Sequence, residues 1–396
     1  MHRLHLRLTN IGLDGWFATA ILWLGAAAIF YLGAAAGPLG AAETLPPVDD
    51  AAASDASFFP PPPPPQIGDA SDATQDNKQA ASEAASAASR GASSGDAADD
   101  HQMWLVSTRG LASAPRDKNG APQVRRYLAR SGWRDASIDE LLAAEQPSAA
   151  TCVLVHGNHT DRQLAVSKGF EVYRTLVRGA KDGQPVRLIV WSWPSDQVPG
   201  SFREDARIKA RRTNIEAYYL ARFLDRLHGA NPVSLVGYSF GARVITGSLH
   251  LLGGGALANH QLEPQKNASR PPIYAVLLAA AVDRDWLLEG RPHGRALSAV
   301  ERMVVLVNPQ DRVLRWYRFV APGEGSEALG SQGLPISLRS GIDREKLVQV
   351  NVANAVGNRH GWTNYLGSNE IIRRLQQETL VETNRRNGNR AQAGGG

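Results

Sequence analysis

Residues 233–244 of this 396-residue chain read VSLVGYSFGARV. The apolar run at their start predicts a short buried strand, and the residues from Ala242 onward predict a helix. Between strand and helix lies a Gly-x-Ser-x-Gly motif centred on Ser239. A serine at the apex of such a turn needs glycines on both flanks, because the strained backbone leaves no room for side chains there. The motif therefore predicts a serine nucleophile at the carboxyl edge of a parallel sheet. The alternative is an ordinary glycine-rich turn whose serine only caps the helix.

From residue 102 onward the chain alternates strand-like and helix-like segments. The strand-like segments are apolar on both faces, which is typical of strands buried between two layers of helices. We therefore expect an α/β fold with a mostly parallel central sheet, covered by helices on both faces, in one domain over residues 102–380. The predicted strands are Met103–Ser107, Tyr127–Ser131, Cys152–Val155, Val186–Trp193, Val233–Val236 (ending at Gly237), Ile273–Ala279, Met303–Val307 and Leu347–Val352. The predicted helices are Arg162–Arg178, Glu204–Leu227, Ala242–Leu252 and Thr363–Glu378.

Residues 1–42 combine a basic start with an uncharged run from Trp16 to Ala42. An apolar run of this length covers a hydrocarbon core of about 30 Å and exceeds the roughly 7–15 apolar residues of a cleavable signal peptide. We expect a signal-anchor with the N-terminus in the cytoplasm and the following domain outside it. Cleavage and secretion of the remainder is one alternative, and a buried core helix is another.

Residues 43–101 are rich in Ala, Ser, Asp and Pro and include six consecutive prolines at positions 60–65. A segment with so few apolar side chains cannot offset the entropy lost on ordering. We therefore expect a disordered linker here, and a disordered tail over residues 381–396.

Charge is distributed unevenly along the chain. The net charge is −9 between Glu43 and Asp100 and +13 from His101 onward. The basic domain suggests contact with an anionic surface, such as phospholipid headgroups, through the predicted helix start at Arg207–Arg212. Nucleic acid is not an expected partner of a domain outside the cytoplasm. The single cysteine, Cys152, excludes an intrachain disulfide and a cysteine-ligated zinc site.

A serine nucleophile needs a histidine to take its proton and an acid to orient that histidine. His360 follows the last predicted strand and precedes the last predicted helix, so its loop should reach the carboxyl edge of the sheet. Asp311 follows the preceding predicted strand in the turn Asn308-Pro309-Gln310-Asp311. Asp283, at the end of the strand before that, is the alternative acid.

Acyl transfer from such a serine also needs two donors for the oxyanion of the tetrahedral intermediate. The backbone N–H of Phe240 is one candidate. The other is a main-chain N–H of Asn158 or His159, in the loop after the strand Cys152–Val155. The segment His156–Asp161 has the spacing H-x-x-H-x-D, which fits no zinc pattern well, so we expect no metal site there.

The substrate pocket is less clearly marked in the sequence. Trp191, Trp193 and the polar, glycine-rich stretch 322–341 are candidates for its lining, and plain packing is the alternative for both tryptophans.

Across nearly all of residues 102–380 the chain resembles the alpha/beta-hydrolase superfamily. More narrowly, it resembles an uncharacterised bacterial branch that shares the strand end Val106–Arg109, the Trp-Pro-Ser motif at Trp193, and an acid-led helix like that from Asp205. The resemblance implies a triad of Ser239, Asp311 and His360.

Two motifs differ from that branch. The branch commonly has His-Ser-Met-Gly where this chain has Tyr238–Gly241, and Tyr-Asn where this chain has Asn158-His159. The second difference leaves the second oxyanion donor open, although neither difference removes a catalytic group.

The sequence thus predicts a serine hydrolase that cleaves a small-molecule or lipid ester through an acyl-enzyme, without a metal or organic cofactor. One alternative is a catalytically silent binding protein with the same fold. Another is an acyltransferase or peptidase that uses the same triad.

Overall fold

The computed structural model describes residues 101–111, 120–146, 148–263, 270–319, 327–335, 337 and 341–381. All of them belong to one compact unit of the chain, Gly68–Gly396. The predicted anchor 1–42, the linker 43–101 and the tail 381–396 lie outside the described residues, apart from His101 and Val381. Within the described ranges, no helix is both long and apolar enough to cross a membrane.

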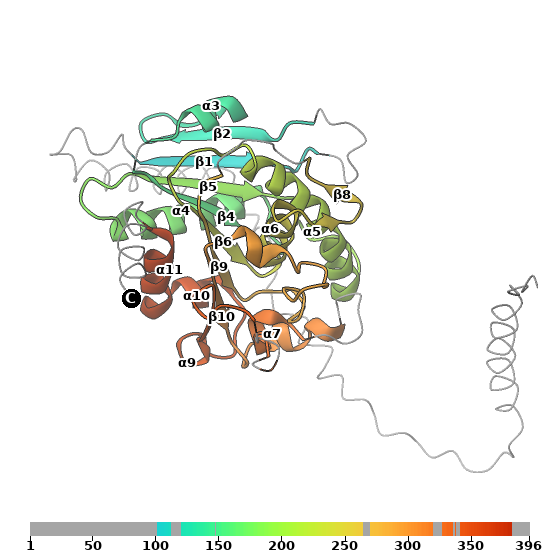
Figure 1. The fold of residues 1–396 in the computed structure, drawn as a ribbon. Helices are drawn as coiled ribbons and strands as arrows, with labels where there is room; N and C mark the ends of the chain where they lie inside the picture. Colours follow the sequence, from blue (N-terminus) through green and yellow to red (C-terminus); the bar gives the residue numbers. More distant parts are fainter. Residues whose placement is uncertain are drawn as a thin grey trace, which may run out of the picture. The chain divides into compact units, whose positions relative to one another are not determined.

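A nine-stranded sheet runs through this unit (Figure 1), in the order β11-β10-β9-β6-β4-β5-β1-β2-β3. The pairs from β11 to β1 are parallel, and only β2 and β3 add in antiparallel fashion at one edge. The expected α/β architecture with a mostly parallel sheet is confirmed. The strands are β1 Gln102–Ser107, β2 Gln123–Leu128, β3 Gly132–Ala136, β4 Ala150–Val155, β5 Val186–Ser192, β6 Val233–Tyr238, β9 Ile273–Leu278, β10 Arg302–Val307 and β11 Leu347–Asn351. A separate two-stranded sheet pairs β7 Ala256–Leu257 with β8 His260–Gln261.

Helices cover both faces of the sheet. Figure 1 shows α4 and α11 on one side and α5 and α6 on the other, and each pair is in mutual contact. Asp161 and Ser201 cap α4 and α5, because their side chains accept hydrogen bonds from backbone N–H groups in the first turn. The α-helices are α3 Ile138–Ala143, α4 Arg162–Gly179, α5 Phe202–Leu224, α6 Phe240–Leu252, α7 Arg312–Arg315, α8 Leu329–Gln332, α9 Ala353–Val356, α10 Trp362–Leu366 and α11 Asn369–Thr379, and the 3-10 helices are η3 Ala296–Ala299 and η4 Tyr317–Phe319.

The core of the unit lies along the central strands. Every residue of β4 and of β6 is buried. Because α-helices pack on both faces of these strands, their sequences are continuous apolar runs rather than alternating ones.

Three predicted segments differ from the structure. The strand predicted at Tyr127–Ser131 covers only the end of β2 and the turn into β3, which form an edge hairpin with half-exposed polar residues. Strand β6 continues through Gly237, which pairs with Val155 on one side and Leu277 on the other. The predicted helix Thr363–Glu378 is two helices, α10 and α11, separated at Gly367 and Ser368.

Candidate active site

Ser239 occupies the turn between β6 and α6, as the sequence motif predicts. Its backbone has φ +55° and ψ −119°, in a region that side-chain-bearing residues rarely adopt. The flanking glycines are required sterically. A Cβ atom on Gly241 would lie 2.0 Å from the carbonyl oxygen of Val155, and one on Gly237 would lie 2.8 Å from the Cα atom of Ala242. The turn that carries Ser239 is therefore packed closely against β4 and the first turn of α6.

His360 lies between Ser239 and Asp311. Its Nε2 atom is 3.1 Å from the Oγ atom of Ser239, and its Nδ1 atom is 2.8 Å from Oδ2 of Asp311. The other oxygen of Asp311 accepts a hydrogen bond from the backbone N–H of Leu314, at 3.0 Å, in the first turn of α7. All three side chains are buried. In this arrangement the imidazole can take the serine proton while the carboxylate holds the ring in one tautomer.

Asp283, the alternative acid, is engaged elsewhere. It accepts a hydrogen bond from the hydroxyl of Tyr317 at 3.2 Å, and the guanidinium of Arg243 lies 3.8 Å from the same carboxylate oxygen. Arg243 in turn stacks over the ring of Trp286, with its Cζ atom 4.2 Å from the ring centroid. The structure thus brings Asp311 to His360, and it places Asp283 in a separate buried cluster.

The loop that carries His360 is fixed by aromatic side chains. The hydroxyl of Tyr238, which precedes Ser239, donates a hydrogen bond to the backbone carbonyl of His360. The ammonium group of Lys168 lies 5.7 Å from the ring centroid of Tyr238 and 5.8 Å from that of Trp362. Burial lowers the pKa of Lys168 to about 8.

The loop after β4 runs directly past Ser239. A Cβ atom on Gly157 would lie 2.9 Å from the Cβ atom of Ser239, so only glycine allows this approach. Phe240 is the first residue of α6, and its N–H has no acceptor within the helix. Phe240 and the start of the loop after β4, at Gly157, therefore lie beside Ser239.

Asp205 orders this loop, although the sequence gives it no role beyond leading a helix. One of its oxygens accepts from the side-chain amide of Asn158 at 2.7 Å and lies 2.8 Å from Nε2 of His159. The other oxygen accepts from the backbone N–H of Val198 at 2.8 Å and from the ammonium of Lys209 at 3.1 Å.

The charge on Asp205 follows from these contacts. Burial raises its pKa, but the hydrogen bonds from Val198, Asn158 and Lys209 outweigh that effect and bring the pKa below its usual value. The sequence signal that could have identified Asp205 is its position four residues before Lys209 on the buried face of a helix.

Two of the basic residues near the start of α5 do not face solvent, contrary to the expected surface contact. The ammonium of Lys209 is bound to Asp205, and the Nε atom of Arg212 donates to the buried carboxylate of Glu216 at 2.9 Å. These two side chains are therefore not available for the predicted contact with an anionic surface. Arg207 and Arg211, by contrast, are exposed.

The two candidate pocket tryptophans are fully buried. The indole N–H of Trp193 donates to the backbone carbonyl of His156 at 2.8 Å, and the two rings stack 5.7 Å apart. Trp191 packs against Phe223 with ring centroids 5.6 Å apart and borders a cavity of about 160 Å³ that Tyr219 also lines. Trp193 thus contacts the loop after β4, and Trp191 packs in the core. Of the stretch 322–341, the structure describes only residues 327–335, 337 and 341.

The H-x-x-H-x-D segment is only partly buried: His156 is buried, His159 is half-buried and Asp161 is exposed. Burial lowers the pKa of His156 well below its usual value. Among the described residues, no group of three or more His, Cys, Asp or Glu side chains could hold a metal ion.

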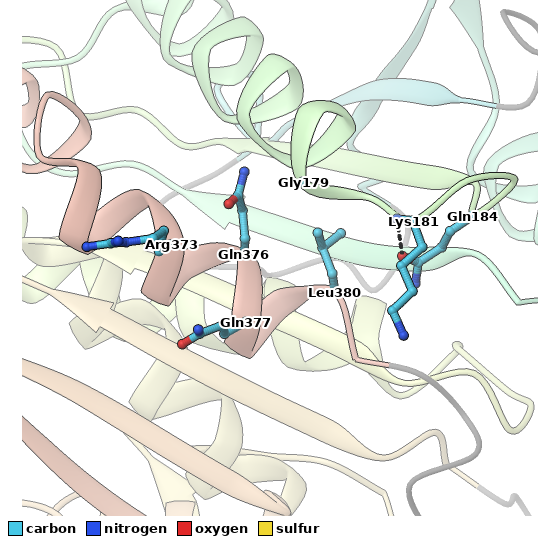
Figure 2. Close-up of a pocket in the computed structure, with 7 residues that line it drawn as sticks. All are labelled: Gly179, Lys181, Gln184, Arg373, Gln376, Gln377 and Leu380. Carbon is cyan, nitrogen blue, oxygen red and sulfur yellow. Dashed lines mark hydrogen bonds between the residues drawn. The ribbon is translucent and has the colours of Figure 1, made fainter.

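A cavity of about 290 Å³ lies at the amino-terminal ends of the parallel strands, opposite the ends near Ser239 (Figure 2). It is formed where α4 ends and the chain leads into β5, beside the last turns of α11. Since Ser239 follows the carboxyl end of β6, this cavity is separate from the candidate active site. Its lining residues are Gly179, Lys181, Gln184, Arg373, Gln376, Gln377 and Leu380.

No family model matches the chain, and no curated protein matches it. Among solved structures, it is similar to esterase B from Lactobacillus Rhamnosis (HN001), with 11% sequence identity and a TM-score of 0.33. The match covers 81% of this chain and 99% of the esterase chain. A TM-score this low does not establish a shared fold or chemistry.

Proposed function

We propose that the protein is a serine hydrolase with an alpha/beta-hydrolase fold, and that it cleaves an ester through an acyl-enzyme intermediate. The observation that carries this proposal is the placement of His360, within hydrogen-bond distance of both Ser239 and Asp311. The order nucleophile, acid, histidine along the chain and the strand–turn–helix around Ser239 support the fold assignment.

In the proposed reaction, Oγ of Ser239 attacks the ester carbonyl carbon while its proton passes to Nε2 of His360. The negative charge develops on the carbonyl oxygen, where the N–H of Phe240 and an N–H of the loop at Asn158 or His159 stabilise it. Collapse of this intermediate breaks the bond to the alcohol oxygen, which takes the proton from His360 as it leaves.

Water then completes the cycle. It gives a proton to Nε2 of His360 and attacks the acyl-serine, and collapse of the second intermediate returns that proton to Ser239 and releases the acid. The carboxylate of Asp311 stabilises the imidazolium form in both steps. The proposed route uses no metal and no organic cofactor.

The test uses the full chain, a fluorophosphonate probe and p-nitrophenyl esters of short and medium acyl length. We expect turnover and labelling of one serine, and loss of both in Ser239→Ala. Ser298→Ala is the matched control, because the hydroxyl of Ser298 donates to the carbonyl of Arg295 at 2.7 Å on the separate helix η3. A folded protein that neither labels nor turns over would be a silent binding protein. Labelling with acyl transfer only to an added alcohol or amine would indicate an acyltransferase.

We propose in addition that residues 1–42 tether the catalytic unit to the outer face of the cytoplasmic membrane. The support is the basic start and the uncharged run from Trp16 to Ala42. Protease added to intact spheroplasts should digest the unit, while the membrane fraction should retain the N-terminal segment. Recovery of the whole chain in the cytosolic fraction would contradict this.

A further inference from the structure

Three large aromatic side chains are exposed beside the candidate active site. The exposed fractions are 46% for Phe202, 58% for Trp316 and 42% for Phe319. Trp316 and Phe319 are in contact, with ring centroids 5.3 Å apart. Exposed aromatic residues that cluster in this way usually mark a binding surface.

Two arginines join these aromatics into one surface. The guanidinium carbon of Arg203 lies 5.9 Å from the ring centroid of Phe319, and that of Arg318 lies 4.9 Å from the same centroid. Since Arg203 follows Phe202, the contact connects the N-terminal end of α5 to η4. We call the surface formed by Phe202, Arg203, Trp316, Arg318 and Phe319 the aromatic–arginine patch.

The patch borders the candidate active site on two sides. The ring of Phe202 lies 6.2 Å from that of His159, in the loop that Asp205 orders beside Ser239. Asp311 caps α7, the helix that leads into Trp316. The patch therefore extends from the loop after β4 to the loop that supplies the candidate acid.

Positive charge surrounds the patch. Residues 312–319 contain three exposed arginines and no acidic residue, and exposed arginines recur every fourth position on α5. Glu204 is an exposed acidic residue among them. Six exposed arginines, three in residues 312–319 and three on α5, form no salt bridge with any residue that the structure describes. They are Arg203, Arg207, Arg211, Arg312, Arg315 and Arg318.

We propose that the aromatic–arginine patch docks on an anionic lipid bilayer and holds the active site against it. Trp and Phe side chains are stable at the boundary between headgroups and acyl chains, and arginine side chains are attracted to phosphate headgroups. A second copy of this chain would bring like charges together. A soluble polyanion would match the charge but would leave Trp316 and Phe319 in water.

The docking itself does not depend on the proposed hydrolase activity. If the protein docks in this way, its substrate is a membrane lipid ester, and this second inference rests on the proposed function. Two readouts are therefore needed, one of docking and one of turnover, so that failure of either can be recognised separately.

The docking experiment uses full-length Phe319→Cys labelled with a polarity-sensitive dye. Cys152 is buried and stays unlabelled. We expect the dye emission to rise with phosphatidylglycerol vesicles and much less with phosphatidylcholine vesicles. Reversal of Arg312, Arg315 and Arg318 to Glu should weaken the response to phosphatidylglycerol at least about tenfold. Dye at Lys181→Cys, at the opposite edge of the sheet, is the matched control and should not respond.

A silent dye, an equal response to both lipids, or a stronger response to dextran sulfate than to vesicles would overturn the proposal. In the turnover experiment, Trp316→Ala/Phe319→Ala should lower the ratio of vesicle-embedded to soluble ester hydrolysis at least about tenfold. An unchanged ratio would overturn the lipid-substrate consequence. A dye response without any ester turnover would leave the docking in place and contradict the hydrolase proposal.

Discussion

The hydroxyl group of Tyr238 donates a hydrogen bond to the backbone carbonyl of His360. The residue before the candidate nucleophile is thus tied directly to the candidate general base, and the two rings lie 5.5 Å apart. Because Ser239 and His360 are 121 residues apart in the chain, such cross-connections must hold their reacting atoms at 3.1 Å. The contact therefore belongs to the support of the site rather than to its chemistry.

We expect Tyr238→Phe to lower kcat by about 10- to 100-fold, because a displacement of His360 by a fraction of an ångström misaligns proton transfer. The measurement is ester turnover, together with an unfolding curve to show that the fold is kept. Tyr365→Phe is the matched control, since it removes a hydroxyl from the same aromatic cluster and leaves the contact with His360 intact. Equal kcat values for the two variants would contradict the supporting role of Tyr238.

We expect Asp311→Asn to lower kcat by about 10⁴-fold, because an amide cannot stabilise the imidazolium and favours the wrong tautomer of His360. Asp283→Asn should reduce kcat by less than about tenfold, since its carboxylate contacts Tyr317 and Arg243 instead. Steady-state kinetics of both variants distinguish the two acids. The reverse ranking would assign the acid to Asp283.

Gly241, two residues after the candidate nucleophile Ser239, should be irreplaceable. Gly241→Ala places a Cβ atom 2.0 Å from the backbone oxygen of Val155, and backbone in the middle of a sheet cannot move away easily. We expect a loss of about 3 kcal/mol or more in the free energy of unfolding, with loss of fluorophosphonate labelling. Gly110→Ala is the control, because among the described residues no atom beyond its chain neighbours lies within 4 Å of its Cβ position. A Gly241→Ala protein as stable as the control would show that the close contact with Val155 does not require glycine at this position.

The parts of the fold that the sequence predicts best are those whose signal is local. Central strands such as β4 and β6 are buried on both faces, so their apolar runs identify them directly. The edge hairpin β2–β3 carries polar, half-exposed residues, so its sequence shows neither a continuous apolar run nor a regular alternation.

The site divides in the same way. Ser239, Asp311 and His360 follow strand ends, and parallel topology brings such residues to one edge; their catalytic roles stay predictions. The partnership of Asp205 with Asn158 crosses 47 residues and has no local pattern. Trp193 follows a strand and donates a hydrogen bond to the backbone carbonyl of His156. A tryptophan that contacts a substrate would have the same sequence pattern, so the pattern does not distinguish the two roles.

Lys168 gives a prediction with a defined dependence on pH. Its side chain is 7% exposed, and its ammonium donates to the hydroxyl of Thr160 at 3.0 Å. Burial lowers its pKa from the usual 10.5 to about 8, although the charges of Glu171 and Asp161 oppose the shift. Between these two pH values the unfolded chain binds more protons than the folded one, so stability rises with pH across this window. Below about pH 8 the cost of the buried charge is fully present, on the order of 3 kcal/mol.

We therefore expect Lys168→Met, which keeps the length of the side chain without the charge, to raise the free energy of unfolding at pH 7. The gain should shrink between pH 8 and pH 10.5, the window in which the wild-type lysine is neutral in the folded state and charged in the unfolded state. Denaturant unfolding of both proteins at pH 7 and pH 10 measures the difference. The same substitution at the exposed Lys181 should change stability little at either pH. A gain or loss for Lys168→Met that is the same at both pH values would show that the charge of Lys168 is not what limits stability at this position.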